Sequence, residues 1–134
     1  MLPHPKFATH LSLTSVVAVV LTALSAGALA ADPAQEVATA ATHAGFAAQA
    51  AGIEQAHMHL HHTVNCLVGP KGQGFDPNEA NPCQKLGDGA IPDTADATAK
   101  AKLTAALAKA QAGLKSDDLS AVKKAATETQ SNLK

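Results

Sequence analysis

Apolar residues recur at helical spacing along the segment 33–66, and this pattern predicts one long amphipathic helix. Asp32 suits the N-cap of this helix, and Pro33 suits its first turn. At about 100° per residue, five apolar side chains form one narrow stripe that we expect to face the core. Gly45 and Gly52 lie on another side, where they either admit a closely packed neighbour or break the segment into two shorter helices. The stripe consists of Phe46, Ile53, Leu60, Val64 and Leu67.

The rest of the chain predicts a loop followed by a helical hairpin. Gly and Pro are frequent across 67–92, so we expect an ordered loop without regular secondary structure there. Apolar residues at helical spacing then predict two antiparallel helices, over about 94–113 and 117–133. Together these elements predict an all-α fold, a small three- or four-helix bundle in a single domain over 31–134. The inward-facing residues of the hairpin are Leu103, Leu107, Ala110, Leu114, Leu119, Val122, Ala126 and Leu133.

Residues 1–30 have the layout of a secretory signal peptide. Lys6 precedes an apolar run over 11–24, and Ala28 and Ala30 supply the small residues that a signal peptidase requires. The run is about fourteen residues long, shorter than the roughly twenty that span a bilayer as a helix. We therefore expect cleavage after Ala30 or Ala31 rather than a retained membrane anchor. The mature chain is then periplasmic or secreted, with no membrane span.

The composition limits the core and excludes one class of partner. Hydrophobic residues make up 46% of the chain, but many of them are Ala, and the chain has three Phe and no Trp or Tyr. Large side chains therefore contribute little to the core. Ten Lys and no Arg stand against eleven acidic residues, for a formal net charge of −1. Because phosphate recognition needs a basic face, we expect no nucleic-acid partner.

Two cysteines, Cys66 and Cys83, flank the predicted loop. In an exported chain of this size they most simply form a disulfide, which closes the loop and adds about 3 kcal/mol of stability. The alternative is a metal site that uses both thiolates. Neither cysteine belongs to a Cys-x-x-Cys unit, and export favours the disulfide.

Five of the seven histidines fall on the first predicted helix, and four of them crowd into residues 57–62. His57 and His61 are one helical turn apart, so their imidazoles can hold one ion, and Glu54 projects toward the same side. We expect these three residues to form the core of a metal site. His59 and His62 point to other sides, where they form a second, weaker pair or are completed by another molecule. His43 lies too far along the helix axis to join this site within one chain.

Imidazole nitrogen suits copper, zinc and nickel, so we expect a transition-metal cofactor whose identity among these three stays open. Nucleophilic catalysis has little support, because no free thiol is expected and no Gly-x-Ser-x-Gly sequence occurs. We therefore expect a binding protein and not an enzyme.

The predicted export signal, the Ala- and Lys-rich hairpin from Ala105 to Ala125 and the histidine cluster together resemble the small periplasmic His-rich metal-binding helical bundle proteins of bacteria. In that family, histidines recur along several helices, whereas here they are confined to His43 and the block 57–62. The disulfide-closed loop is also foreign to the family. The resemblance implies sequestration or buffering of copper, nickel or zinc.

Two other functions stay open at this point. One is a non-metal interaction or structural module, in which the first helix and the Gly/Pro-rich loop form a partner surface. The other is a bundle that holds a b-type haem through one histidine and Met58. In either case, the Ala/Gly face of the first helix offers a surface for a homodimer, because small side chains let helices approach closely.

Overall fold

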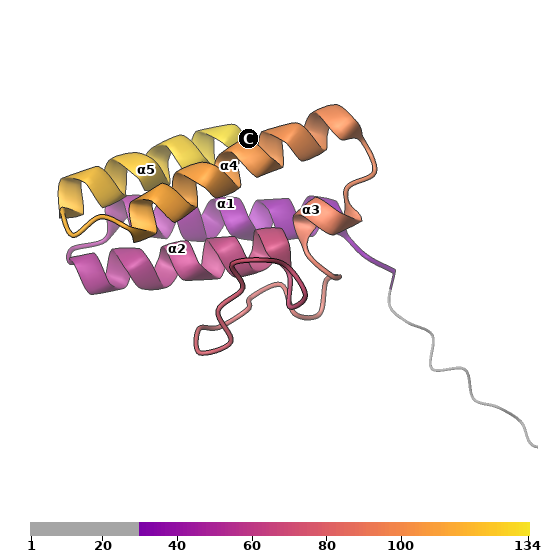
Figure 1. The fold of residues 1–134 in the computed structure, drawn as a ribbon, viewed down its shortest axis with the longest axis horizontal. Coiled ribbons are helices and arrows are strands. Elements are labelled where there is room, and N and C mark those ends of the chain that lie inside the picture. The colour runs from indigo at the N-terminus through magenta and orange to yellow at the C-terminus, as the bar shows by residue number, and fades with distance from the viewer. Residues whose placement is uncertain (1–29) are drawn as a thin grey trace, which may run out of the picture.

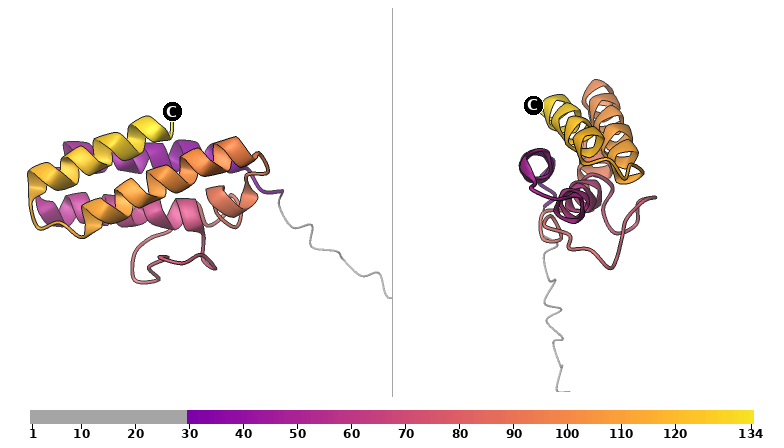
Figure 2. Two further views of the ribbon diagram at one scale, coloured as in Figure 1. Left: turned by 45° about the horizontal axis from the view of Figure 1, so that its top comes forward. Right: turned by 90° about the vertical axis from the view of Figure 1, so that its left-hand side faces the viewer.

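The structure, a computed structural model, describes residues 30–134 and is all-helical over that range, as predicted. The predicted signal peptide lies outside the described residues apart from Ala30. Four long helices pack as a bundle in which α1 lies beside α2 and α5, and α4 lies beside α5 and α2 (Figures 1 and 2). The helices are α1 Pro33–Gln49, α2 Ile53–Val68, α3 Ala90–Asp93, α4 Ala97–Leu114 and α5 Leu119–Asn132.

The segment 33–66 forms two helices, not the single helix that its apolar pattern predicts. The chain leaves α1 at Ala50 with an extended backbone (φ −58°, ψ 143°) and enters α2 through Gly52, also extended (φ −141°, ψ 162°). Of the two alternatives for the glycines, Gly52 therefore marks the break. Gly45 serves the other purpose, since a Cβ there would collide with the side chain of Gln130 on α5.

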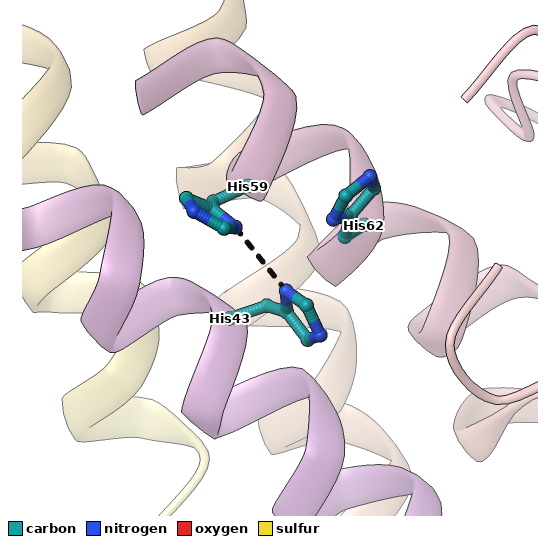
Figure 3. A group of neighbouring side chains, drawn as sticks. All are labelled: His43, His59 and His62. Carbon is teal, nitrogen blue, oxygen red and sulfur yellow. Dashed lines mark hydrogen bonds between the residues drawn. The ribbon is translucent and has the colours of Figure 1, made fainter. Parts of the chain in front are cut away.

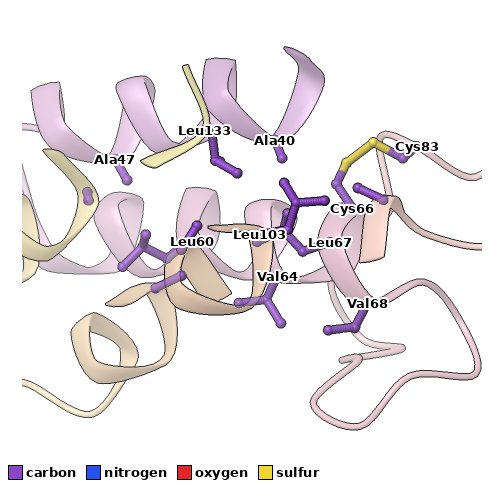
Figure 4. Packing of buried hydrophobic residues seen from close by; sticks show 14 of the residues in the cluster. Ala40, Ala47, Leu60, Val64, Cys66, Leu67, Val68, Cys83, Leu103 and Leu133 are labelled. Carbon is purple, nitrogen blue, oxygen red and sulfur yellow. A yellow bond between two sulfur atoms is a disulfide. The ribbon is translucent and has the colours of Figure 1, made fainter. Parts of the chain in front are cut away.

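The break changes which side chains of the first segment enter the core. Leu60, Val64 and Leu67 are buried on α2, as the stripe predicts, and pack against small α1 residues such as Ala40 (Figure 4). Phe46 is 47% exposed, so its predicted core position is wrong. The prediction assumed a continuous helical phase, and the turn at 50–52 resets that phase.

The C-terminal hairpin follows its prediction closely. Leu103 and Ala110 of α4 and Val122 and Ala126 of α5 are buried. The helices begin two or three residues later than expected, because Asp96 and Asp118 are the residues whose side chains accept the N-cap hydrogen bonds.

The loop between the two hairpins is closed by the predicted disulfide between Cys66 and Cys83, with an S–S distance of 2.07 Å. Its last part forms the short helix α3, although the segment 67–92 was expected to lack regular structure. Pro92 occupies the first turn of α3, where a missing N–H removes no helical hydrogen bond.

The Ala/Gly face of the first helix is already in use within the chain. Ala40, Ala44, Gly45 and Ala47 are all buried, and α1 packs against both α2 and α5. This face, predicted as a homodimer surface, is therefore an intramolecular one. Within residues 30–134, none of the helices combines the length and the apolar character that crossing a membrane requires.

Candidate metal centre

Three histidine side chains from two helices meet on the outer side of the α1–α2 pair (Figure 3). His43 comes from α1, and His59 and His62 come from α2. Each offers one ring nitrogen, and the three nitrogens lie within 4.8 Å of one another. Among residues 30–134, this is the one group of three or more histidine, cysteine or carboxylate side chains that lies so close.

The antiparallel packing of α1 on α2 brings these rings together. His43 and His59 each lie eight residues from Ala51, the middle of the turn, so they face each other across the hairpin. The buried hydroxyl of Thr63 donates to the carbonyl oxygens of His59, at 3.0 Å, and of Ala40, at 3.3 Å. The hydrogen bond to Ala40 joins α2 to α1 next to the site, whereas the one to His59 stays within α2.

Aromatic packing restricts the positions of the rings. The ring of Phe46 packs edge-on against that of His43, with centroids 5.6 Å apart, and lies 5.3 Å from that of His59. On the other side, His62 packs edge-on against His43 at a centroid distance of 5.0 Å. The exposed Phe46 therefore covers one side of the histidine cluster instead of filling the core.

The three rings favour the neutral form. Burial, followed by the proximity of His62 and His59, lowers the pKa of His43 to about 4. Burial also lowers the pKa of His59. For His62, burial and then the neighbouring His59 lower the pKa, while Glu79 acts in the opposite direction. Neutral imidazole is the form that binds a metal, so at neutral pH the rings do not have to lose a positive charge before they bind.

The spacing of the nitrogens suits a tetrahedral ion. The Nδ1 atoms of His43 and His59 are 3.3 Å apart. Two nitrogens that each lie 2.0–2.1 Å from a tetrahedral zinc ion are about 3.3–3.4 Å apart. Without an ion, the same distance is a hydrogen bond between one protonated and one unprotonated nitrogen.

His62 supplies a nitrogen that has no other role. Its Nδ1 atom is buried and has no hydrogen-bond partner in the described part of the chain. Its Nε2 atom lies 3.6 Å from Oε2 of Glu79, within ion-pair range. A buried, unpartnered ring nitrogen is unfavourable unless something binds to it, which makes this atom a candidate ligand.

The three residues predicted as the core of the site lie elsewhere on α2. Nε2 of His57 is 3.0 Å from the carbonyl oxygen of Ser116, so this ring ties α2 to the α4–α5 turn. Nδ1 of His61 lies 3.6 Å from Oδ2 of Asp76 in the loop. Glu54 is exposed. The structure does not gather Glu54, His57 and His61 into one group of ligands, and it joins His59 and His62, the predicted second pair, to His43.

The expectation that His43 stays remote is wrong, because it depended on an unbroken helix. The signal that could have found the site is the symmetry of His43 and His59 about the turn at 50–52. Reading that turn as a hairpin brings the two residues together without further information.

Comparison with other proteins adds no functional evidence. No protein-family model matches the chain, and neither the curated proteins nor the solved structures compared with it give a match. The resemblance to small periplasmic His-rich bundle proteins stays a prediction.

Proposed function

We propose that this chain is an exported protein that sequesters or buffers one transition-metal ion, copper, zinc or nickel, at His43, His59 and His62. One observation carries the proposal: three histidine nitrogens from two packed helices lie within 4.8 Å of one another. The lowered pKa values of all three rings support it, because the rings are uncharged at neutral pH.

The ligand set suits buffering. Three imidazoles leave one position of a tetrahedral ion open to water or to a ligand from another molecule. An ion held in this way can be passed on through ligand exchange. Among divalent ions, nitrogen ligands of this type hold Cu(II) more tightly than Ni(II) or Zn(II), so Cu(II) is expected to bind most tightly.

Metal titration of the untagged protein tests the proposal. Isothermal titration with Cu(II), Zn(II) and Ni(II) is expected to give one ion per chain. His43→Ala and His59→Ala should each abolish or strongly weaken binding. His57→Ala and His61→Ala are the matched controls, since they remove the same ring from α2, the helix of His59, without touching the cluster.

The opposite pattern, in which the His57 and His61 variants lose the ion and the His43 and His59 variants keep it, assigns binding to the pair predicted from helical spacing and refutes the proposed centre. Far-ultraviolet circular dichroism of each variant confirms that the helices are intact. Export is tested separately, by the mass of the protein recovered from its native compartment, which should lack 30 or 31 residues.

The haem alternative has weaker support from the structure. It needs Met58 as an inward-facing ligand, and Met58 is 36% exposed on α2. If added haem gives no Soret band, the haem alternative is refuted.

A further inference from the structure

We infer that Glu79, on the disulfide-closed loop, is a positioning residue of the metal centre: its carboxylate holds the proton of His62 on Nε2 and leaves Nδ1 free for the ion. This inference rests on the proposed function, and it makes the loop part of the centre although the loop supplies none of the three nitrogens.

The two nitrogens of His62 lie in different surroundings. Nε2 faces Oε2 of Glu79 at 3.6 Å, and the two side chains are 12% and 33% exposed. Nδ1 is buried without a partner among the described residues. In Figure 3 one ring nitrogen of His62 faces the other two rings and the other points away from them.

Electrostatics select one of the two neutral forms of this ring. A neutral imidazole has one N–H donor and one acceptor nitrogen. With the proton on Nε2, the N–H points at a carboxylate and the lone pair of Nδ1 is free. With the proton on Nδ1, a lone pair faces the carboxylate and a buried N–H lacks an acceptor. The first form is therefore favoured, and it is the form that binds a metal through Nδ1.

Carboxylates behind metal-binding histidines have this effect generally. They fix the ring orientation and raise the basicity of the ligand nitrogen, and their removal typically lowers metal affinity by about 10–100-fold.

The loop is held so that Glu79 stays in this position. The side chain of Asn65, fully buried on α2, accepts from the backbone N–H of Asp76 at 2.9 Å. The two N–H groups of its amide are shared among three backbone carbonyl oxygens, those of Asp76, at 2.9 Å, Ala80, at 3.1 Å, and Glu79 itself, at 3.4 Å.

The disulfide repeats the same pairing one helical turn further along. Cys66 follows His62 by four residues, and Cys83 follows Glu79 by four. The Cys66–Cys83 link, with its separation of 17 residues, therefore joins the same two segments as the His62–Glu79 pair and in the same register. Both the Asn65 side chain and the disulfide hold the loop backbone that carries Glu79 against α2.

The test compares Glu79→Gln with Asp76→Asn in the untagged protein. Both changes replace a carboxylate that lies 3.6 Å from a histidine nitrogen by its amide, but Asp76 faces His61, which is outside the cluster. Competition titration of Cu(II) and Zn(II) against a chromophoric chelator is expected to show about 10–100-fold weaker binding for Glu79→Gln, at an unchanged one ion per chain. Asp76→Asn should stay within about twofold of the wild type. Equal affinities of the two variants would overturn the inference.

A second measurement needs no metal and so separates this inference from the proposed function. Long-range ¹H–¹⁵N NMR of the metal-free protein reports which ring nitrogen carries the proton. His62 is expected to be protonated on Nε2 in the wild type and in Asp76→Asn, and to become a mixture in Glu79→Gln. A proton on Nδ1 in the wild type would refute the role of Glu79. If the wild type binds no metal although His62 carries its proton on Nε2, the proposed function is refuted and the role of Glu79 in placing that proton is not.

Discussion

Replacing Glu36 by Gln should stabilise the protein at neutral and alkaline pH. Glu36 lies in the first turn of α1 and is fully buried. Its Oε1 atom accepts from the backbone N–H of Gly89 at 3.0 Å, while Oε2 is buried without a partner among the described residues. Burial raises the pKa of this carboxyl from 4.5 to about 7, and nearby Asp93 acts in the same direction.

The raised pKa gives the size and the sign of the effect. Glu36 binds a proton more tightly in the folded state, so its contribution to stability is complete below pH 4.5 and is lost as the pH rises to 7. A shift from 4.5 to about 7 corresponds to a loss of about 3 kcal/mol above pH 7. A glutamine keeps the acceptor for Gly89, offers a donor to Asp93 and never ionises, so it should avoid this loss.

His43 titrates in the opposite sense over nearly the same range. Its pKa falls from 6.5 to about 4 in the folded state, mainly through burial. The folded state therefore favours the neutral ring, so this contribution is present above pH 6.5 and is lost as the pH falls through 4. In the wild type the contributions of these two groups oppose each other between pH 4.5 and 6.5.

Urea unfolding between pH 4.5 and 8, with EDTA present, separates the two contributions. Glu36→Gln should be more stable than the wild type at pH 8, by up to about 3 kcal/mol, and should lose stability on acidification. His43→Asn should lose less stability on acidification than the wild type, because one ring with a lowered pKa is removed. Glu128→Gln is the control, because hydrogen bonds from Lys109 and Lys124 lower the pKa of Glu128 to about 2, below this range. An unchanged pH profile in Glu36→Gln, or a lower stability at pH 8, would refute the reasoning.

Three further results are expected from unfolding experiments. Replacing both Cys66 and Cys83 by Ser should lower the free energy of unfolding by about 3 kcal/mol, since the unfolded chain loses its closed loop. Gly69→Ala should lower the free energy of unfolding by more than about 1 kcal/mol, because φ is +67° and a Cβ there would overlap the backbone carbonyl oxygen of Asp88. Gly52→Ala is the control: open space surrounds this position, so the free energy of unfolding should change by no more than about 0.5 kcal/mol. Zn(II) at about 100 times its Kd should stabilise the wild type by about 2.7 kcal/mol, seen as a higher Tm that EDTA reverses; no shift in Tm would contradict a site in the folded state.

Local chemistry made much of the fold predictable. The disulfide follows from the count of cysteines and the expected compartment, and the C-terminal hairpin follows from the apolar spacing of residues such as Leu103 and Val122. The density of Gly and Pro predicts no helix at α3, although proline such as Pro92 is compatible with the first turn of a helix. These features depend on few residues that are close together in the sequence.

The break between α1 and α2 could not be decided locally. Ala50 and Ala51 favour a helix, and no proline interrupts the segment, so helix propensity points to continuity. Folding back is favoured by tertiary packing, which buries Leu60 and Val64 against α1 and the C-terminal hairpin. The proposed metal centre depends entirely on this tertiary choice. Histidine spacing within one helix therefore identified the helix that carries two of the ligands, but not the set that meets.

The ligands from α1 and α2 are separated by few residues, since His43 and His59 are only 16 positions apart. Contacts of such short range form early in folding, before the distant C-terminal hairpin is docked. An ion that joins these ligands would therefore act on the transition state as well as on the final structure. Metal should speed refolding in stopped-flow experiments, and an unfolded chain that meets the ion would use it as a nucleus for assembling its first two helices.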